Sequence, residues 1–274
     1  RMPDPVLQQV EHFNNPGITA NDAFKPVTRY FDRITRPEQI IQSFPAAVQT
    51  MLDPADCGPA CIALSQDIQG QTFDYPEEFF KERVHAIRRP RPDEFQIKEA
   101  AEKIKSSKNP IIISGGGVFY SDAMEELSQF AIKHNIPVTQ TVMGYSTMKR
   151  DHSHFAGQIG GLGGKNTNTL AKETDLAIAV GTKLADFTTG SWANFENKNF
   201  KLVSINVSRF DANKHLAQAV IGDAKVSLTE LSQVLGSWKA GEEWNKKSQI
   251  ELKSWNDHID KESAPTNQEG PSYV

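Results

Sequence analysis

The chain has 274 residues, which is enough for one large domain or for one domain with substantial additional segments. Its 30 Lys and Arg against 34 Asp and Glu give a formal net charge of −4, so no basic field is available to attract a nucleic acid. No apolar stretch approaches the roughly 20 residues that cross a bilayer, and the first residues carry no signal pattern. We therefore expect a cytoplasmic protein that binds neither nucleic acid nor membrane.

The first 68 residues contain one helical pattern, residues 40–52, and one strand pattern, residues 60–64. This is too little sheet for a complete α/β domain, so we interpret residues 1–68 as the end of a larger domain. The chain's two cysteines, Cys57 and Cys61, are too few for a disulfide framework or a four-ligand zinc site. We expect both to be reduced thiols.

Residues 69–94 are predicted to form a linker. The segment mixes charges densely and contains the run Arg88-Arg89-Pro90-Arg91-Pro92, in which each proline disfavours helix at the residue before it.

Residues 95–236 alternate helix and strand patterns in the order expected of βαβ units. Ile97, Ala100, Ala101 and Ile104 form an apolar helical stripe, and the apolar strand 111–113 then ends in glycines. Further helices are predicted around 124–131, 165–173 and 224–235, and further strands at 137–138, 176–180, 201–205 and 219–221. The pattern predicts an α/β fold with a Rossmann-like, doubly wound, mostly parallel sheet.

Residues 237–274 carry Trp238, Trp244 and Trp255 among many charged residues. We expect a helical segment whose apolar face packs on the rest of the protein, followed by a loop after Ser263. The sequence begins at Arg1 and ends at Val274 just after a Gly-Pro pair, and it completes no catalytic constellation. We therefore interpret it as part of a larger enzyme.

Glycines follow two of the predicted buried strands. Because the carboxyl ends of parallel strands meet at one edge of a sheet, we expect Gly115, Gly116, Gly117, Gly181 and Thr182 to line a nucleotide-type crevice. The dinucleotide fingerprint is incomplete, since its third glycine is absent and no acidic residue follows about 20 positions later. An NAD site is therefore not predicted.

Two other patterns fail as functional motifs. The run from Gly160 to Lys165 has neither the first glycine nor the hydroxyl residue of a phosphate-binding P-loop. His152 and His154 could point the same way, but no third ligand lies nearby in the sequence. We predict no metal site and no catalytic residue in this chain.

Residues 98–231 resemble the central domain of thiamine-diphosphate-dependent enzymes related to acetolactate synthase. The resemblance rests on residues 110–118, 136–138, 157–160, 175–182 and 221–224, and residues 37–68 are similar to the end of the preceding pyrimidine-binding domain. Residues 19–34 and 79–92 are similar to one member of that family, a hydrolase of myo-inositol catabolism that opens a cyclic diketone to a linear deoxy-uronic acid.

This resemblance implies an enzyme that uses thiamine diphosphate and Mg²⁺, in which the cofactor carries out the chemistry. In such enzymes the cofactor is held by the pyrimidine-binding and diphosphate-binding domains, so we expect those domains as partners, a homodimer or homotetramer, and a small cyclic diketone as substrate. The loop with Thr141, Met143 and Gly144 is expected to face the neighbouring domains.

One departure from the family bears on ligands of the crevice. Asn206-Val207-Ser208 stands where relatives often have an acidic pair, which weakens the case for bound flavin or ADP. Two alternatives stay open from the sequence: a regulatory module that binds FAD or ADP, and a purely structural assembly platform.

Overall fold

The computed structural model describes residues 14, 15 and 17–265, and the chain divides into two compact units, Arg1–Arg88 and Arg89–Val274. The division falls inside the predicted linker 69–94. Parts of two predicted segments, residues 1–13 with 16 and residues 266–274, lie outside the described residues. No described helix combines the length and the apolar character needed to cross a membrane.

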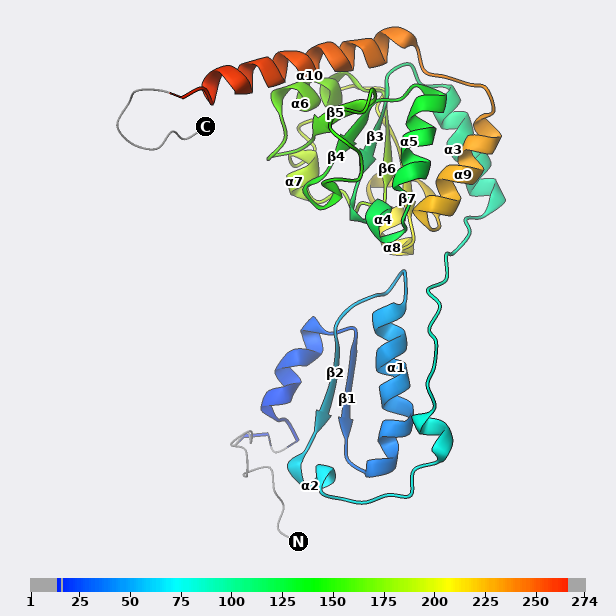
Figure 1. Ribbon diagram of the computed structural model, residues 1–274, viewed down its shortest axis with the longest axis vertical. Helices are drawn as coiled ribbons and strands as arrows, with labels where there is room; N and C mark the ends of the chain where they lie inside the picture. The colour runs from blue at the N-terminus through cyan, green and yellow to red at the C-terminus, as the bar shows by residue number, and fades with distance from the viewer. Residues whose placement is uncertain (1–13, 16, 266–274) are drawn as a thin grey trace. The chain divides into compact units, whose positions relative to one another are not determined.

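The first unit is built on two parallel strands and one long helix (Figure 1). Strand β1 (Tyr30–Ile34) pairs with β2 (Ala60–Leu64), and α1 (Ile40–Leu52) packs against both. The short helices η2 (Ala20–Val27), η3 (Pro37–Gln39), α2 (Gln66–Gln69) and η4 (Glu77–Phe80) complete it. Strand β1 was not predicted, because its two central residues are the charged Asp32 and Arg33.

Asp32 is held in place by the start of the helical segment that follows it. Its carboxylate accepts a hydrogen bond from Gln39 Nε2 at 3.0 Å and another from the Ser43 hydroxyl. These bonds lower the pKa of Asp32 although burial opposes the change. A charged residue is therefore compatible with this strand because its partners come from the adjoining helices.

Among the described residues, the second unit holds a six-stranded parallel sheet with the order β5-β4-β3-β6-β7-β8. The central strand β3 (Pro110–Ser114) is fully buried, like β6 (Leu176–Val180) beside it. The other strands are β4 (Val138–Gln140), β5 (Phe155–Gln158), β7 (Lys201–Asn206) and β8 (Gln218–Ile221). The predicted doubly wound α/β sheet is confirmed.

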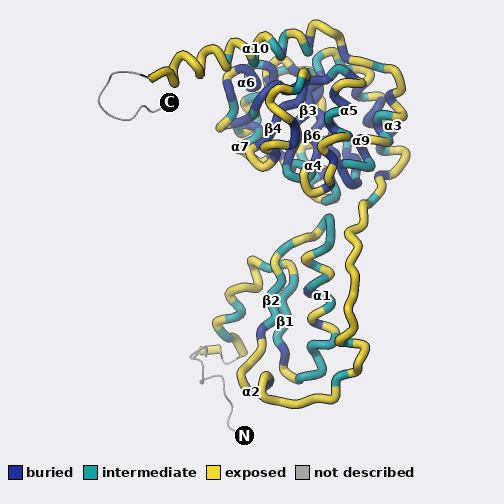
Figure 2. The backbone as a smooth tube through the Cα atoms, in the orientation of Figure 1, coloured by how far each residue is buried: buried dark blue, intermediate teal, exposed yellow. Residues whose placement is uncertain are grey.

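Alternate residues of β3, a strand that is buried throughout (Figure 2), belong to two separate apolar cores. Ile112 packs with the helices α3 (Glu94–Lys105), α5 (Met124–His134) and α9 (Ala224–Leu235) on one face. Ile111 and Ile113 pack on the other face with α6 (Lys165–Glu173) and with α10 (Glu242–Glu262) through Trp244. Both faces of the sheet are thus covered, as a parallel sheet requires.

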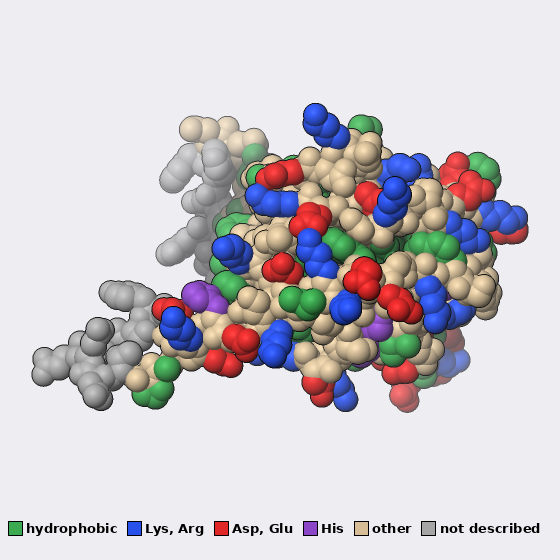
Figure 3. All heavy atoms as spheres, turned by 90° about the horizontal axis from the view of Figure 1, so that it is seen from above, with side chains coloured by type: hydrophobic (Ala, Val, Ile, Leu, Met, Phe, Trp, Pro, Cys, Tyr) green, Lys and Arg blue, Asp and Glu red, His purple; other side chains and the backbone are tan. Residues whose placement is uncertain are grey.

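Helix α10 accounts for much of the Trp-containing segment that the sequence left unplaced. The buried Trp244 donates its indole N–H to Pro110 O at 2.8 Å, and Gln249 Nε2 donates to Phe155 O of the edge strand β5 at 3.0 Å. The helix therefore fixes one face of the sheet and covers part of its open edge. On the face of the molecule seen in Figure 3, acidic and basic side chains are interspersed.

Asp223 ties the start of unit 2 to helix α9. Its buried carboxylate accepts from Lys225 N at 3.0 Å as the N-cap of α9, and it lies 3.1 Å from Arg89 Nη1. Pro90 O accepts from Asp223 N at 2.8 Å. The second part of the predicted linker is therefore an ordered part of unit 2.

Replacing Asp223 with Ala should lower the free energy of unfolding of unit 2 by about 1–2 kcal/mol, because the helix loses its cap. Urea unfolding followed by tryptophan fluorescence measures this, since Trp192, Trp238, Trp244 and Trp255 all lie in unit 2. The exposed Asp257→Ala on α10 is the control and should change stability by less than about 0.5 kcal/mol. Equal effects of the two substitutions would contradict the assigned cap.

Candidate functional site at the carboxyl ends of the parallel strands

The loops that leave β3, β4 and β6 meet at one edge of the sheet. Strand β3 lies between β4 and β6, so the chain leaves it in one direction and later returns on its other side. In open α/β sheets this switch point is where ligands bind. The three loops contain all eight residues that the sequence singled out.

The loops after β3 and β6 are in direct backbone contact. Gly117 N donates to Gly181 O at 2.9 Å, and Gly115 N donates to Val180 O at the same distance. A Cβ atom on Gly117 would lie 2.6 Å from the Cα of Gly181, and Gly181 itself has a φ of +60°. The glycines therefore allow two backbones to approach more closely than side chains would permit.

The loop after β4 joins the same cluster. Thr141 N donates to Ser114 O at 3.0 Å, and the Thr141 hydroxyl accepts from Gly144 N at 3.0 Å. A Cβ atom on Gly116 would lie 3.1 Å from Met143 O. The three loops pack together, and we call them the three-loop cluster: residues 115–117, 141–144, 181 and 182.

Thr182 connects the cluster to strand β7. Its hydroxyl accepts from Leu184 N at 3.3 Å, and its carbonyl accepts from Asn206 Nδ2 at 3.3 Å. Asn206 Oδ1 also accepts from Ser208 N at 2.9 Å. The side-chain amide of Asn206 is thus engaged in holding these loops together.

The three-loop cluster offers backbone groups and apolar side chains to its surroundings. Met143 is 72% exposed, whereas Thr141 and Gly144 are buried. None of the eight residues has an ionisable side chain. Their arrangement can bind a ligand or another protein surface, and it provides no group for proton transfer.

Large exposed apolar residues surround the cluster, and sequence analysis recognised only Met143 among them. Each follows the carboxyl end of a strand in the chain, which is the signal that could have found them. We call this set the apolar rim: Phe119 and Tyr120 after β3, Val142, Met143 and Tyr145 after β4, Leu162 after β5, Phe187 after β6, and Phe210 after β7. Single exposed apolar residues are ordinary, but a set following five strands at one edge indicates a contact surface.

His152 and His154 form hydrogen bonds with neighbouring residues. His152 Nε2 lies 3.0 Å from Ser128 Oγ, and its Nδ1 accepts from His154 N at 3.1 Å. The buried His154 lies 3.1 Å from Asn135 Oδ1 through Nε2. Among residues 14, 15 and 17–265, no three His, Cys, Asp or Glu residues gather as metal ligands.

Burial, together with the neighbouring His152, lowers the pKa of His154 to about 4. The unfolded chain binds this proton near pH 6.5, whereas the folded protein does not, so unfolding becomes easier as the pH falls from about 6.5 toward 4. We expect protonation of His154 to lower the free energy of unfolding by roughly 3 kcal/mol over this pH range. In urea unfolding at several pH values, His154→Gln should lose less stability on acidification, whereas the exposed His258→Gln should behave like the wild type. Equal pH dependence in both variants would contradict this assignment.

The close contact between the loops after β3 and β6 leads to a second prediction. Gly117→Ala should lower the free energy of unfolding by about 1–3 kcal/mol, because the backbone that its methyl group would meet cannot move aside cheaply. Gly161→Ala is the matched control, since a Cβ atom there would make only ordinary contacts of 3.7 Å or more, with Phe187, and should change stability by less than about 0.5 kcal/mol. Thermal unfolding of both variants measures the difference, and a neutral Gly117→Ala would show that the loops are not tightly packed.

Comparison with known proteins identifies the family to which this fold and site correspond. Residues 97–231 match the family described as "Thiamine pyrophosphate enzyme, central domain". The chain belongs to the thiamine pyrophosphate enzymes, and its second unit contains their central domain, as the sequence motifs predicted.

The similarity to particular relatives extends beyond that domain. The chain is 49% identical over 235 residues to a Clostridium perfringens protein named 3D-(3,5/4)-trihydroxycyclohexane-1,2-dione hydrolase, covering 86% of this chain and 37% of the relative. Relatives of the same name from Bacillus licheniformis and Bacillus subtilis are 48% and 46% identical over 243 residues, or 88% of this chain and 38% of each relative. The chain thus spans a little over a third of the length of these curated relatives.

Proposed function

We propose that this chain contributes the central domain of a thiamine-diphosphate-dependent hydrolase acting on 3D-(3,5/4)-trihydroxycyclohexane-1,2-dione in inositol catabolism. The observation that carries the proposal is the 49% identity over 235 residues, because it extends well outside the 97–231 segment shared across the family. The regulatory and purely structural alternatives are not favoured, since the relatives with this identity are named as hydrolases of one substrate.

The proposed reaction breaks the ring bond between the two adjacent carbonyl carbons and yields 5-deoxy-glucuronate. One water is consumed for each bond broken, which leaves a carboxylic acid at one new end and an aldehyde at the other. Thiamine diphosphate, held by the flanking domains, would supply the nucleophilic carbon that this kind of carbon–carbon bond cleavage needs.

The described residues do not fit the cofactor's diphosphate and Mg²⁺. No three metal-ligating side chains gather among them, and a side chain on Gly115 or Gly117 would meet the backbone of the loop at Gly181. We therefore assign thiamine diphosphate and Mg²⁺ to the pyrimidine-binding and diphosphate-binding domains that the family implies. No catalytic step is assigned to a residue of this chain.

The proposed contribution of unit 2 is to dock those domains. The apolar rim supplies the contact surface, and the three-loop cluster holds its members at fixed positions. Met143 lies three residues after the end of strand β4 and, being largely exposed, is suited to a position at the mouth of the active site. We further propose that the whole enzyme is a homodimer or homotetramer.

A domain replacement tests the proposal. The corresponding segment of the Clostridium perfringens relative is exchanged for residues 89–262 of this chain, and hydrolysis of the cyclic diketone is measured. We expect kcat within about tenfold of the parent, because the rim should dock on the same neighbouring domains. In the same chimera, Met143→Glu should lower kcat/KM at least about tenfold, since a charge would be buried at the interface.

The matched control in the same chimera is Ile250→Glu, which adds the same charge at an exposed apolar site on α10 outside the apolar rim. It should leave kcat/KM unchanged. A chimera that folds and assembles like the parent but does not hydrolyse the diketone would overturn the assigned function.

A further inference from the structure

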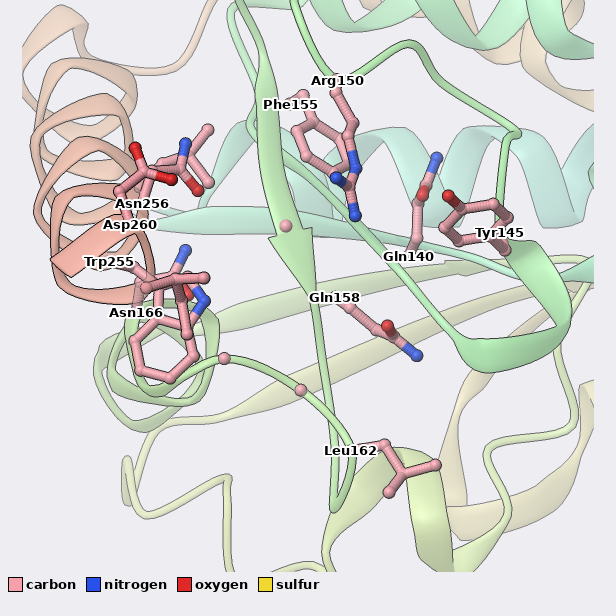
Figure 4. A pocket seen from close by; sticks show the side chains of 15 residues that line it. Gln140, Tyr145, Arg150, Phe155, Gln158, Leu162, Asn166, Trp255, Asn256 and Asp260 are labelled. Atoms are coloured by element: carbon pink, nitrogen blue, oxygen red, sulfur yellow. The ribbon is translucent and has the colours of Figure 1, made fainter. Parts of the chain in front are cut away.

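A pocket at the β5 edge of the sheet adjoins the three-loop cluster, and Tyr145 and Leu162 of the apolar rim line part of it. It has a volume of about 540 Å³ and is formed by the end of β5, the beginning of α6, the segment after β4 and the C-terminal half of α10 (Figure 4). None of the eight residues of the three-loop cluster lines it. Strand β5 and helix α10, which are far apart in the sequence, create it by packing together.

Asn166 presents an unused acceptor in this pocket. The residue is 3% exposed, and its Nδ2 donates to Ala156 O at 2.7 Å, which fixes the orientation of the amide. Its Oδ1 is buried and accepts no hydrogen bond from the part of the chain that the structure describes. An unsatisfied buried acceptor is costly, so this atom favours a ligand that donates a hydrogen bond.

Trp255 of α10 supplies a donor next to this acceptor. Figure 4 shows its indole beside Asn166, with Asn256 and Asp260 nearby on the same helix. A methyl group on Gly164 would lie 2.8 Å from Trp255 Nε1 and would also collide with Asn166 Oδ1. Any side chain at residue 164 would therefore displace one of these two polar atoms.

The electrostatics favour one negative charge in the ligand. Arg150 lines the pocket and forms no ion pair with any described residue. Helix α6 is nine residues long and begins at the pocket with no side-chain cap, so its first N–H groups add a partial positive charge. Among the described residues, Asp260 at the α10 side carries the one carboxylate that lines the pocket, and it can accept from a hydroxyl.

We propose that this pocket binds a small polyhydroxylated carboxylate of monosaccharide size. A hydroxyl group both donates and accepts, so a single one can satisfy Asn166 Oδ1 and the Trp255 N–H, while Arg150 and the start of α6 receive the carboxylate. The ligand class includes the proposed product 5-deoxy-glucuronate, so the identity of the natural ligand rests on the proposed function, whereas binding to this chain alone can be tested without it.

Isothermal titration calorimetry of the full chain tests the proposal, with D-glucuronate as the probe. D-Glucose, which has the hydroxyls without the charge, and acetate, which has the charge without the hydroxyls, are the comparison ligands. We expect saturable binding of glucuronate, at least about tenfold tighter than either comparison ligand. No saturable heat, or equal binding of acetate or of glucose, would overturn the proposal.

Substitutions locate the binding. Gly164→Ala displaces one of the two polar atoms at an ordinary backbone conformation, and Trp255→Phe removes the N–H while keeping most of the ring. Each should weaken glucuronate binding at least about tenfold, whereas Trp192→Phe, in the same unit but outside the pocket, should not. Binding that survives both pocket substitutions in folded protein would place the ligand elsewhere and contradict the assignment.

Discussion

The backbone contact between Gly117 and Gly181 is the constraint on which the rest of unit 2 depends. It joins the loops of the two central strands, β3 and β6, at the point where the chain reverses its direction across the sheet. Because these loops touch through backbone atoms, the segments that follow them begin at fixed positions. Phe119 and Phe187 of the apolar rim come after these two loops in the chain.

The same constraint explains why this end of the sheet is suited to binding another surface and not to proton transfer. A sheet end closed by glycine backbones leaves little room for ionisable groups, and the cluster carries none. The exposed apolar residues around it are instead suited to contact with other protein surfaces. This division agrees with the proposed role, in which flanking domains hold the cofactor and unit 2 positions them.

Much of the fold could be predicted because apolar periodicity reports burial directly. The fully buried strands β3 and β6 and the helices α3, α5 and α9 show strong patterns, and the glycines after β3 and β6 marked the switch point. Strand β5 was missed because its four residues include Gly157 with a φ of +108° and form no apolar run. The pocket at α10 could not be predicted, since it depends on tertiary packing between residues about a hundred positions apart.

Hydrogen exchange at the apolar rim tests the central claim most directly. Backbone exchange in residues 115–120, 141–145 and 181–187 would be measured by mass spectrometry in this chain alone and in the domain-replacement chimera. The account predicts slower exchange of these segments in the chimera, with unchanged exchange at the exposed end of α10. Equal exchange at the rim in both proteins would contradict the claim that this edge docks the cofactor-binding domains.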